Sequence, residues 1–186
     1  MNKRTIYKKD YTEVVPTFKI GDKQCYTLQI NPQEIEGGMY VVLSHTYDHY
    51  PTDADKVELY QGYLEKIKQN KLYEIDRYDK SENVNGFYLA GQLAWLPKAD
   101  RVGLANSTAI EKAAGQETTT LYLNGVAVTL PVDTALQMLS ALELYALACY
   151  RRTEEHKIAV RNLTDIVEAE NYDCTTGYPD KLHFEL

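Results

Sequence analysis

The residues that could do chemistry are concentrated in one short stretch, HTYDHYPTDAD, which places two histidines and three aspartates within eleven positions. Imidazole nitrogens and carboxylate oxygens bind divalent metals, so His45, Asp48 and His49 are the candidate metal ligands. On a strand, His45 and His49 share one face with Tyr47 between them, but residues four apart lie about 13 Å apart, too far to bind one ion. The pattern therefore favours a polar strand end followed by helix-capping acids, and only a turn would bring the ligands together.

His156 is the second chemical candidate, and it lies in a periodic stripe of small and apolar residues. The run 132–163 contains neither glycine nor proline, and the stripe positions recur every three or four residues. This spacing averages about 3.5 residues, which is typical of a helix that keeps one face against a partner. The stripe consists of Val132, Ala135, Leu139, Leu142, Ala146, Cys149, Thr153, His156, Val160 and Leu163.

The two halves of this stripe have different surroundings. The first half is apolar nearly all round, so we expect residues 132–150 to form a buried central helix. The later half has a charged outer face and is the candidate contact with another chain. That candidate interface consists of Thr153, His156, Val160 and Leu163. A polar layer of Thr153 and His156 can fix the register of a coiled coil, but a histidine hydrogen-bonded inside the core is the favoured alternative.

Composition excludes several classes of function. The formal charge of −7, from 27 acidic and 20 basic residues, disfavours nucleic acid because it repels a phosphate backbone. No segment approaches the roughly 20 apolar residues that span a bilayer, so we expect no membrane contact and a chain that is cytoplasmic at synthesis. The sequence has no CxxC pair, no Gly-x-Ser-x-Gly motif and no phosphate-binding glycine loop. These observations predict a protein that is not an enzyme and holds no cofactor.

The first third of the chain predicts strands followed by a helix. TFKIGDKQCYTLQI indicates two strands around a Gly-Asp turn, NPQEIEGG breaks the chain, and MYVVLSHTY indicates a further strand. The basic first nine residues predict a frayed terminus. The apolar spacing in 52–71, with Thr52 and Asp55 as capping candidates, predicts an amphipathic helix. The polar run YEIDRYDKSENVNG then divides the chain into a β-rich segment with a helix, 1–77, which could serve in attachment, and a C-terminal domain, 78–186.

The remaining sequence predicts hairpins and helices. NVNGFYLAGQLAWL indicates a tight hairpin around Gly91, and TTTLYLNGVAVTL indicates a second one joined by Asn124-Gly125, which suits a type I′ turn. Helices are expected at 97–114, at 132–163 and in a short capped segment that follows, before a final strand. The expected fold class is α+β, with short antiparallel hairpins packed on long C-terminal helices and a β-rich N-terminal part.

Several motifs that follow one another along the chain resemble a known family. They are YDKSENVNGFYL, AWLPKADRVGLANS, ETTTLYLNG, LQMLSALELYALACY, TEEHK and YDCTTGYPDKL. In this order they resemble a bacteriophage and prophage domain of unknown function found in gut Bacteroidales, and the resemblance extends more weakly to MYVVLSHTYDHYP. It implies a phage or prophage product similar to proteins encoded near tail or tail-fibre genes. No reaction is established for that family, so the resemblance implies no catalytic residues.

The expected function is a non-enzymatic structural, adaptor or assembly protein of the phage tail or tail-fibre region. Its expected partners are tail or fibre proteins and further copies of itself, and a structural part is expected in the virion. Three alternatives remain open. They are a cytosolic chaperone for fibre assembly, a glycan-binding module that uses exposed tyrosines and Trp95, and a small metal-dependent hydrolase built on His45, Asp48 and His49. The 16 tyrosines fit either amphipathic elements or a tyrosine-rich recognition surface.

Overall fold

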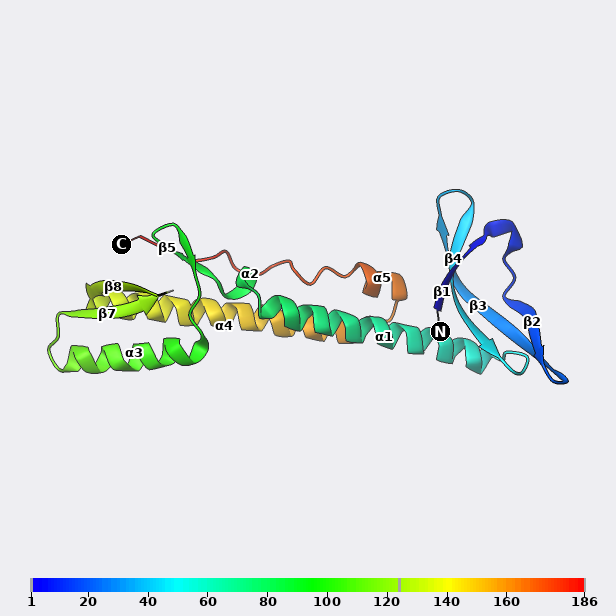
Figure 1. Ribbon diagram of the computed structural model, residues 1–186, viewed down its shortest axis with the longest axis horizontal. Helices are drawn as coiled ribbons and strands as arrows, with labels where there is room; N and C mark the ends of the chain where they lie inside the picture. Colours follow the sequence, from blue (N-terminus) through cyan, green and yellow to red (C-terminus); the bar gives the residue numbers. More distant parts are fainter. Residues whose placement is uncertain (1, 124, 186) are drawn as a thin grey trace. The chain divides into compact units, whose positions relative to one another are not determined.

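The computed structural model describes residues 2–123 and 125–185, and the chain divides into two compact units (Figure 1). Unit 1 comprises Met1–Asn70 and Leu163–Asn171, and unit 2 comprises Lys71–Asn162 and Tyr172–Leu186. Helices and antiparallel sheets are both present, with a β-rich N-terminal part and a long helix towards the C-terminus. The predicted α+β class is confirmed.

A four-stranded antiparallel sheet forms the β-rich part of unit 1. Its order is β1-β4-β3-β2. The strands are β1 (Asn2–Tyr7), β2 (Val14–Ile20), β3 (Lys23–Ile35) and β4 (Met39–Tyr47), and a short 3₁₀ helix, η1 (Lys8–Asp10), follows β1. The predicted hairpin between β2 and β3 is confirmed. The expected frayed terminus is wrong, because β1 pairs with β4 along its whole length.

β3 is longer than the sequence predicts, because much of the expected break at NPQEIEGG lies inside the strand. The pairing of β3 with β4 shifts between Ile30 and Gln33. In this bulge Asn31 has a φ of 52°, a left-handed conformation that asparagine adopts more readily than most residues. Pro32 can remain in the strand because a residue in a bulge need not donate a hydrogen bond to the neighbouring strand.

The first helix, α1 (Asp53–Asp79), begins with a reciprocal cap. The backbone N–H of Thr52 donates to Oδ2 of Asp55 at 2.7 Å, and the backbone N–H of Asp55 donates to the Thr52 hydroxyl at 3.3 Å. This capping box confirms the predicted helix start. The first part of α1 packs with β4 and with α5 (Ile166–Asn171) in the core of unit 1. That core contains Leu43, Leu64, Ile67, Ile166 and Ala169.

α1 continues past the predicted domain boundary. The polar run expected to separate two domains is helical up to Asp79, and Ile75 within it is fully buried. Charged residues such as Glu, Lys and Arg are good helix formers, so polar composition alone does not end a helix. The units divide after residue 70, and residues 163–171 belong to unit 1. The predicted segments 1–77 and 78–186 are corrected accordingly.

Unit 2 contains the two hairpins that the sequence predicts. β5 (Phe87–Leu89) and β6 (Gln92–Ala94) form the first, and β9 (His183–Phe184) pairs with β5 in parallel. β7 (Thr118–Leu123) and β8 (Val126–Pro131) form the second, whose turn at Asn124 lies outside the described residues. The helices of this part are α2 (Glu82–Asn85), α3 (Lys98–Ala113) and α4 (Val132–Asn162).

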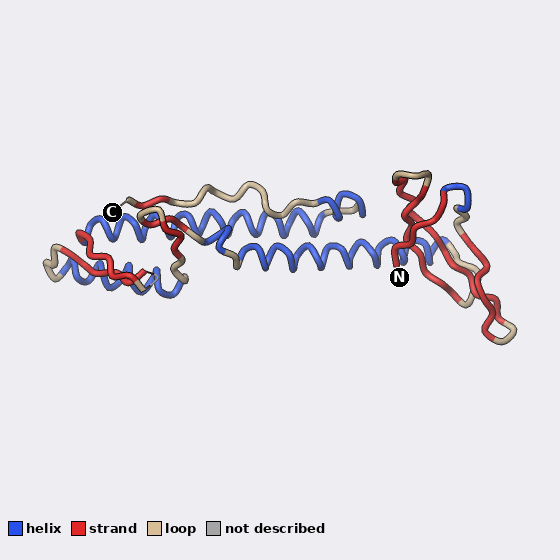
Figure 2. The backbone as a smooth tube through the Cα atoms, turned by 45° about the horizontal axis from the view of Figure 1, so that its top comes forward, coloured by secondary structure: helices blue, strands red, loops and turns tan. Residues whose placement is uncertain are grey.

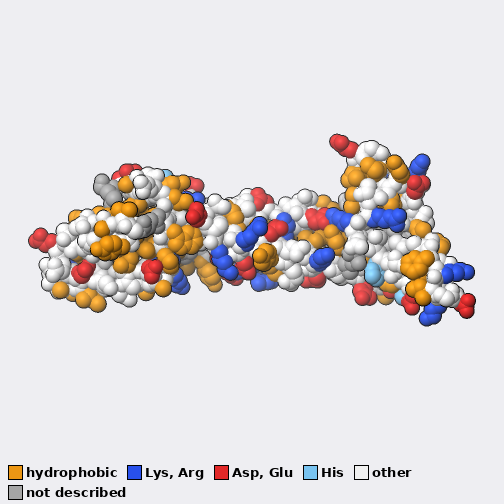
Figure 3. Space-filling view, viewed as in Figure 1, with side chains coloured by type: hydrophobic (Ala, Val, Ile, Leu, Met, Phe, Trp, Pro, Cys, Tyr) orange, Lys and Arg blue, Asp and Glu red, His pale blue; other side chains and the backbone are white. Residues whose placement is uncertain are grey.

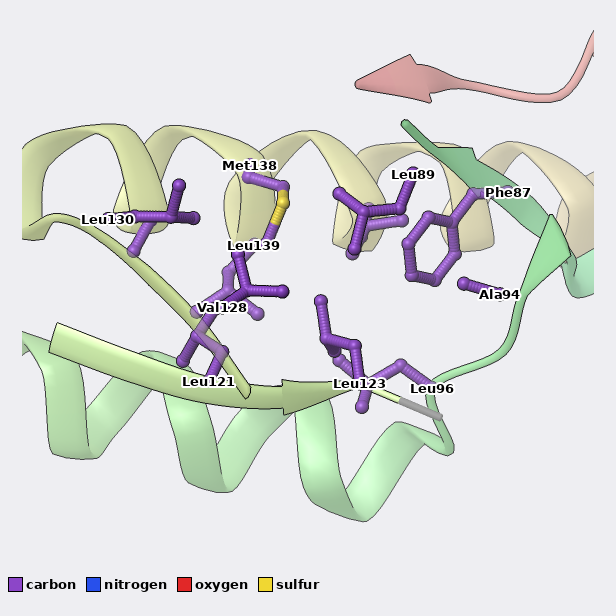
Figure 4. Close-up of a cluster of buried hydrophobic side chains, with 12 residues drawn as sticks. Phe87, Leu89, Ala94, Leu96, Leu121, Leu123, Val128, Leu130, Met138 and Leu139 are labelled. Carbon is purple, nitrogen blue, oxygen red and sulfur yellow. The ribbon is translucent and has the colours of Figure 1, made fainter. Parts of the chain in front are cut away.

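An apolar core holds the hairpins of unit 2 on α3 and α4. Thr119, Leu121 and Leu123 of β7 are buried, which is the period of two expected for a strand with one covered face. Figure 4 shows the core side chains between the two helices, with Met138 and Leu139 of α4 pointing into the same cluster. The expected packing of short hairpins on long helices is therefore confirmed.

The periodic stripe of α4 faces the interior of this chain. Its buried members are Val132, Ala135, Leu139, Leu142, Cys149, Thr153, His156 and Val160. The expectation that the first half of α4 is covered all round is wrong, because Leu144, Leu147 and Tyr150 are 69%, 42% and 60% exposed. α4 is thus buried along one face and exposes large apolar side chains on another.

Residues 172–182 contain no regular helix or strand, and they lie along α4 (Figure 2). Hydrogen bonds from α4 side chains to Thr176 and Tyr178 hold this segment in place. In the part of the chain that the structure describes, no helix is both long enough and apolar enough to cross a membrane.

Candidate functional site

A cleft of about 520 Å³ opens on unit 2, and all the residues that line it belong to this unit. The last residue of α1, α2, the first turn of α3 and the middle of α4 form its walls. Its volume falls within the roughly 300–1,000 Å³ that is typical of ligand sites. The charged side chains of the lining are Asp79, Lys80, Lys98, Arg101 and Glu143.

The segment between β6 and α3 places Trp95 in this cleft. Ala94 and Leu96 are 4% and 6% exposed and belong to the apolar core, as Figure 4 shows. Alternate residues of an extended segment point to opposite sides, so Trp95 is directed away from that core. Trp95 is half-buried and lines the cleft with Leu147 and Tyr150 of α4. The cleft therefore has an aromatic and aliphatic surface.

Arg101 ties the walls of the cleft together from the first turn of α3. Its side chain is 9% exposed, its Nε donates to Oε1 of Glu143 at 2.9 Å, and its Nη1 donates to the backbone carbonyl of Leu96 at 2.8 Å. One guanidinium thus links α3 to α4 and to the segment that carries Trp95. Because an arginine presents several donors in a fixed plane, it can hold both acceptors at once.

Asp79 is directed into unit 2 at the other end of the cleft. Its Oδ1 accepts a hydrogen bond from the Thr153 hydroxyl at 2.6 Å, and its backbone carbonyl accepts one from the Asn85 side chain. The two carboxylates of the lining are therefore both engaged within the chain, Asp79 by a hydroxyl and Glu143 by a guanidinium.

Lys80 and Lys98 differ from the other charged lining residues. Both are exposed, and among residues 2–123 and 125–185 neither has a carboxylate within ion-pair distance. Lys98 is also the first residue of α3, whose start carries no side-chain cap. The first N–H groups of a helix lack partners in the helix and favour negative charge, but Asp100 in the first turn of α3 already supplies an acidic group there, so Lys98 is the source of positive charge at this rim of the cleft. This arrangement suits binding of a ligand with apolar and acidic groups.

His156 lies outside this cleft and is a core residue. It is 1% exposed, its Nε2 donates to the carbonyl of Thr176 at 2.9 Å, and its Nδ1 accepts from the Tyr172 hydroxyl at 2.7 Å. This tautomer follows from the partners, because a carbonyl oxygen can only accept. The Tyr178 ring stacks on the imidazole at 5.6 Å. The favoured prediction, a histidine hydrogen-bonded inside the core, is confirmed.

The predicted interface with another chain needs correction. Thr153, His156 and Val160 are at most 1% exposed within this chain, so they are not available to a partner. Leu163 is half-buried and packs against the core of unit 1. The charged outer face of late α4 misled the prediction, because the stripe opposite to it is covered by the segment 172–178 rather than by a second chain.

The histidine and aspartate cluster near the end of β4 forms no shared ligand set. The ring of Tyr47 lies between the two imidazoles, 4.8 Å from His45 and 5.4 Å from His49, as strand geometry predicts. His49 instead contacts Oδ1 of Asp48 at 3.1 Å and Oδ2 of Asp55 at 3.3 Å. These two carboxylates raise the pKa of His49. Within the described residues no group of three His, Cys, Asp or Glu side chains is placed to hold a metal ion.

Sequence reasoning missed Arg101 and Glu143, which lie 42 positions apart. A signal for Arg101 is present, because Arg101, Leu104, Ala105 and Thr108 have the spacing of one helix face, and Arg101 and Thr108 are buried. An arginine on the covered face of a helix requires an acceptor nearby. The sequence does not reveal which carboxylate or carbonyl supplies it.

Comparison with protein-family models, with curated proteins and with solved structures finds no match to this chain.

Proposed function

We propose that this chain is a non-enzymatic structural, adaptor or assembly protein of a phage tail or tail-fibre region, and that it acts by binding other proteins. The ordered motifs that resemble the phage and prophage family support the setting. The exposed apolar side chains of α4 beside the cleft support the mode of action, and they are the observation that carries the proposal.

Leu144, Leu147 and Tyr150 are spaced by three residues, so they are neighbours on the helix surface. Each leaves a large part of its area exposed, from 42% for Leu147 to 69% for Leu144, and removing apolar area from water is favourable by about 25 cal/mol per Å². Exposed apolar groups that lie together on a surface are typical of protein contacts. The β7–β8 hairpin also exposes Tyr122 and Val126, and Figure 3 shows apolar side chains at the surface over this part of unit 2.

Cross-linking mass spectrometry on the phage or induced prophage that encodes this chain tests the proposal. We expect cross-links to another tail or fibre protein, and a structural part must also be present in purified virions. Cross-links to a fibre protein without presence in the virion identify the chaperone alternative. Recovery of the chain from infected cells without any cross-linked tail or fibre protein contradicts the proposal.

Self-association stays a prediction. Its interface has to use other residues than the predicted ones, because Thr153, His156 and Val160 are buried within the chain. Mass measurement in solution at tens of micromolar protein tests it, with Leu144→Asp as the variant that should dissociate an oligomer built on the exposed side of α4. A strict monomer refutes self-association. The stripe residues Leu139 and Leu142 would not argue against that result, because they are already packed inside the chain.

Glycan binding is a second candidate, favoured by the position of Trp95 beside Asn85 and Tyr150 in the cleft. Aromatic rings pack on the apolar face of a sugar, while amide and carboxylate groups accept or donate hydrogen bonds to its hydroxyls. A glycan array probed with the full chain and with Trp95→Ala tests this candidate. Loss of specific signals in the variant supports it, and the absence of specific signals from the full chain contradicts it.

A further inference from the structure

The cleft on unit 2 combines an apolar surface with two lysines that have no acidic partner. Of its five charged side chains, Arg101 is paired with Glu143, and Asp79 accepts a hydrogen bond from the neutral Thr153 hydroxyl, which leaves its negative charge in place. Lys80 and Lys98 remain, and no carboxylate among the described residues pairs with either one. A ligand that completes this site brings negative charge to the rim and an apolar group to the surface formed by Trp95 and Leu147.

The apolar surface extends beyond the cleft along α4. A second, shallower hollow of about 630 Å³ is lined by Leu136 and Leu144 together with charged and polar side chains such as Lys112 and Asp133, and Leu144 lies one helical turn from Leu147 in the cleft. From Leu136 to Tyr150 the helix rises about 21 Å, which corresponds to about six residues of extended chain. The two hollows together therefore match a short peptide segment in length.

We propose that this cleft is the docking site for an extended segment of a partner protein that carries a bulky apolar side chain next to an aspartate or glutamate. The apolar side chain occupies the space beside Trp95 and Leu147. The acidic group lies against Lys98, or against Lys80 at the other end of the cleft.

The net charge of the chain does not oppose this assignment. The charge of −7 is spread over 186 residues, and at physiological salt interactions between exposed charges are screened beyond about 8 Å. The lining itself carries three cationic and two anionic side chains, a net charge of +1, so an acidic group at the rim meets a local charge of opposite sign. Charge pairs at exposed positions contribute about 0.2–1 kcal/mol each, so we expect them to select the partner while apolar contact supplies most of the affinity.

Selection from a display library of short random peptides on the full chain tests the proposal. Counter-selection uses the double variant Lys80→Glu and Lys98→Glu. We expect enriched peptides to carry Asp or Glu beside Leu, Phe or Trp. Individual synthetic peptides without tryptophan are then titrated, and the emission of Trp95 reports binding directly because the chain has one tryptophan.

A matched control separates the cleft from general charge effects. Lys19→Glu and Lys66→Glu change the net charge equally, and both lysines are exposed residues of unit 1. We expect Lys80→Glu with Lys98→Glu to weaken peptide binding about tenfold or more, since the attraction between the acidic group and its lysine becomes a repulsion, and the control pair to change it less than twofold. Circular dichroism confirms that each variant remains folded.

Three results overturn the proposal. They are enrichment of basic peptides or of none, equal losses in the variant and control pairs, and a Trp95 shift with uncharged oligosaccharides that the lysine variants do not alter. The proposal rests on the proposed function but fails separately from it. Cross-links to a tail or fibre protein at sites away from the cleft support the proposed function and contradict this docking site. Peptide binding in the cleft without cross-links to any tail or fibre protein supports the docking site and contradicts the proposed function.

Discussion

Replacing Arg101 by methionine tests how the walls of the cleft are held together. The change removes the guanidinium and keeps an aliphatic side chain of similar reach. The side chain of Arg101 is 9% exposed, whereas that of its partner Glu143 is 37% exposed. The two hydrogen bonds that the variant loses therefore differ in cost, because only one acceptor can be solvated by water afterwards.

The larger cost comes from the carbonyl of Leu96, which belongs to a residue that is 6% exposed. Loss of a charged hydrogen bond to a buried acceptor costs about 1.5–3 kcal/mol. The ion pair with the more exposed Glu143 contributes up to about 1 kcal/mol. We expect Arg101→Met to lower the free energy of unfolding by about 1.5–4 kcal/mol in total, and Glu143→Gln, which keeps an oxygen acceptor for Arg101, to lower it by less than about 1 kcal/mol.

Urea unfolding, followed by circular dichroism and by the emission of Trp95, measures both variants. Arg151→Met is the control, because Arg151 is an exposed residue of α4, and it should change stability by less than about 0.5 kcal/mol. Arg101→Met should also shift the emission of Trp95 to longer wavelength. The segment that carries Trp95 loses its hydrogen bond from Arg101 to the Leu96 carbonyl, so the indole becomes more accessible to water. A loss in Glu143→Gln as large as that in Arg101→Met would refute the reasoning.

Three further predictions concern other parts of the chain. The carboxylates of Asp48 and Asp55 raise the pKa of His49, so its stabilising contribution is complete below the unfolded-state pKa of about 6.5 and is lost as the pH rises through the higher folded-state pKa. An NMR titration should show this raised pKa, and Asp55→Asn should lower it. The three thiols are buried, and burial raises the pKa of Cys149 and Cys174, so a thiol reagent should modify them only after unfolding. Rapid reaction of the native chain would contradict this. Tyr172→Phe leaves Nδ1 of buried His156 without its donor and should cost about 1–3 kcal/mol in urea unfolding, whereas Tyr73→Phe, at a residue that is 70% exposed, should be neutral.

Much of the local structure follows from sequence, because its causes are local. The β7–β8 hairpin was predictable from two β-branched runs around an Asn-Gly pair, and the start of α1 from Thr52 and Asp55. His156 was predictable as a core residue, because a lone histidine on a mostly apolar helix face usually finds a hydrogen-bond partner nearby. The hairpin and the helix start depend on residues within a few positions of one another, whereas the partners of His156, Tyr172 and Thr176, lie 16 and 20 positions away and were not predicted.

Features that depend on distant residues were not predictable in the same way. Asn31 and its bulge let β3 continue through a sequence that looks like a break, and the pairing with β4 decides this. The composition of early α4 suggested burial on all sides, yet Leu144 and Leu147 are 69% and 42% exposed. Apolar character predicts a preference for burial, but the shape of the neighbouring elements decides which side chains obtain it.

The sequence by itself determined the α+β class, the hairpins, most helix starts and the periodic face of α4, because hydrogen bonding and side-chain periodicity act over a few residues. The tertiary structure alone decided that this face is closed by residues 172–178 and not by a second chain. It also decided that Trp95, Arg101 and Glu143 meet in one cleft. A side chain's partner depends on how elements that are distant in sequence pack together. A local sequence pattern does not contain that information.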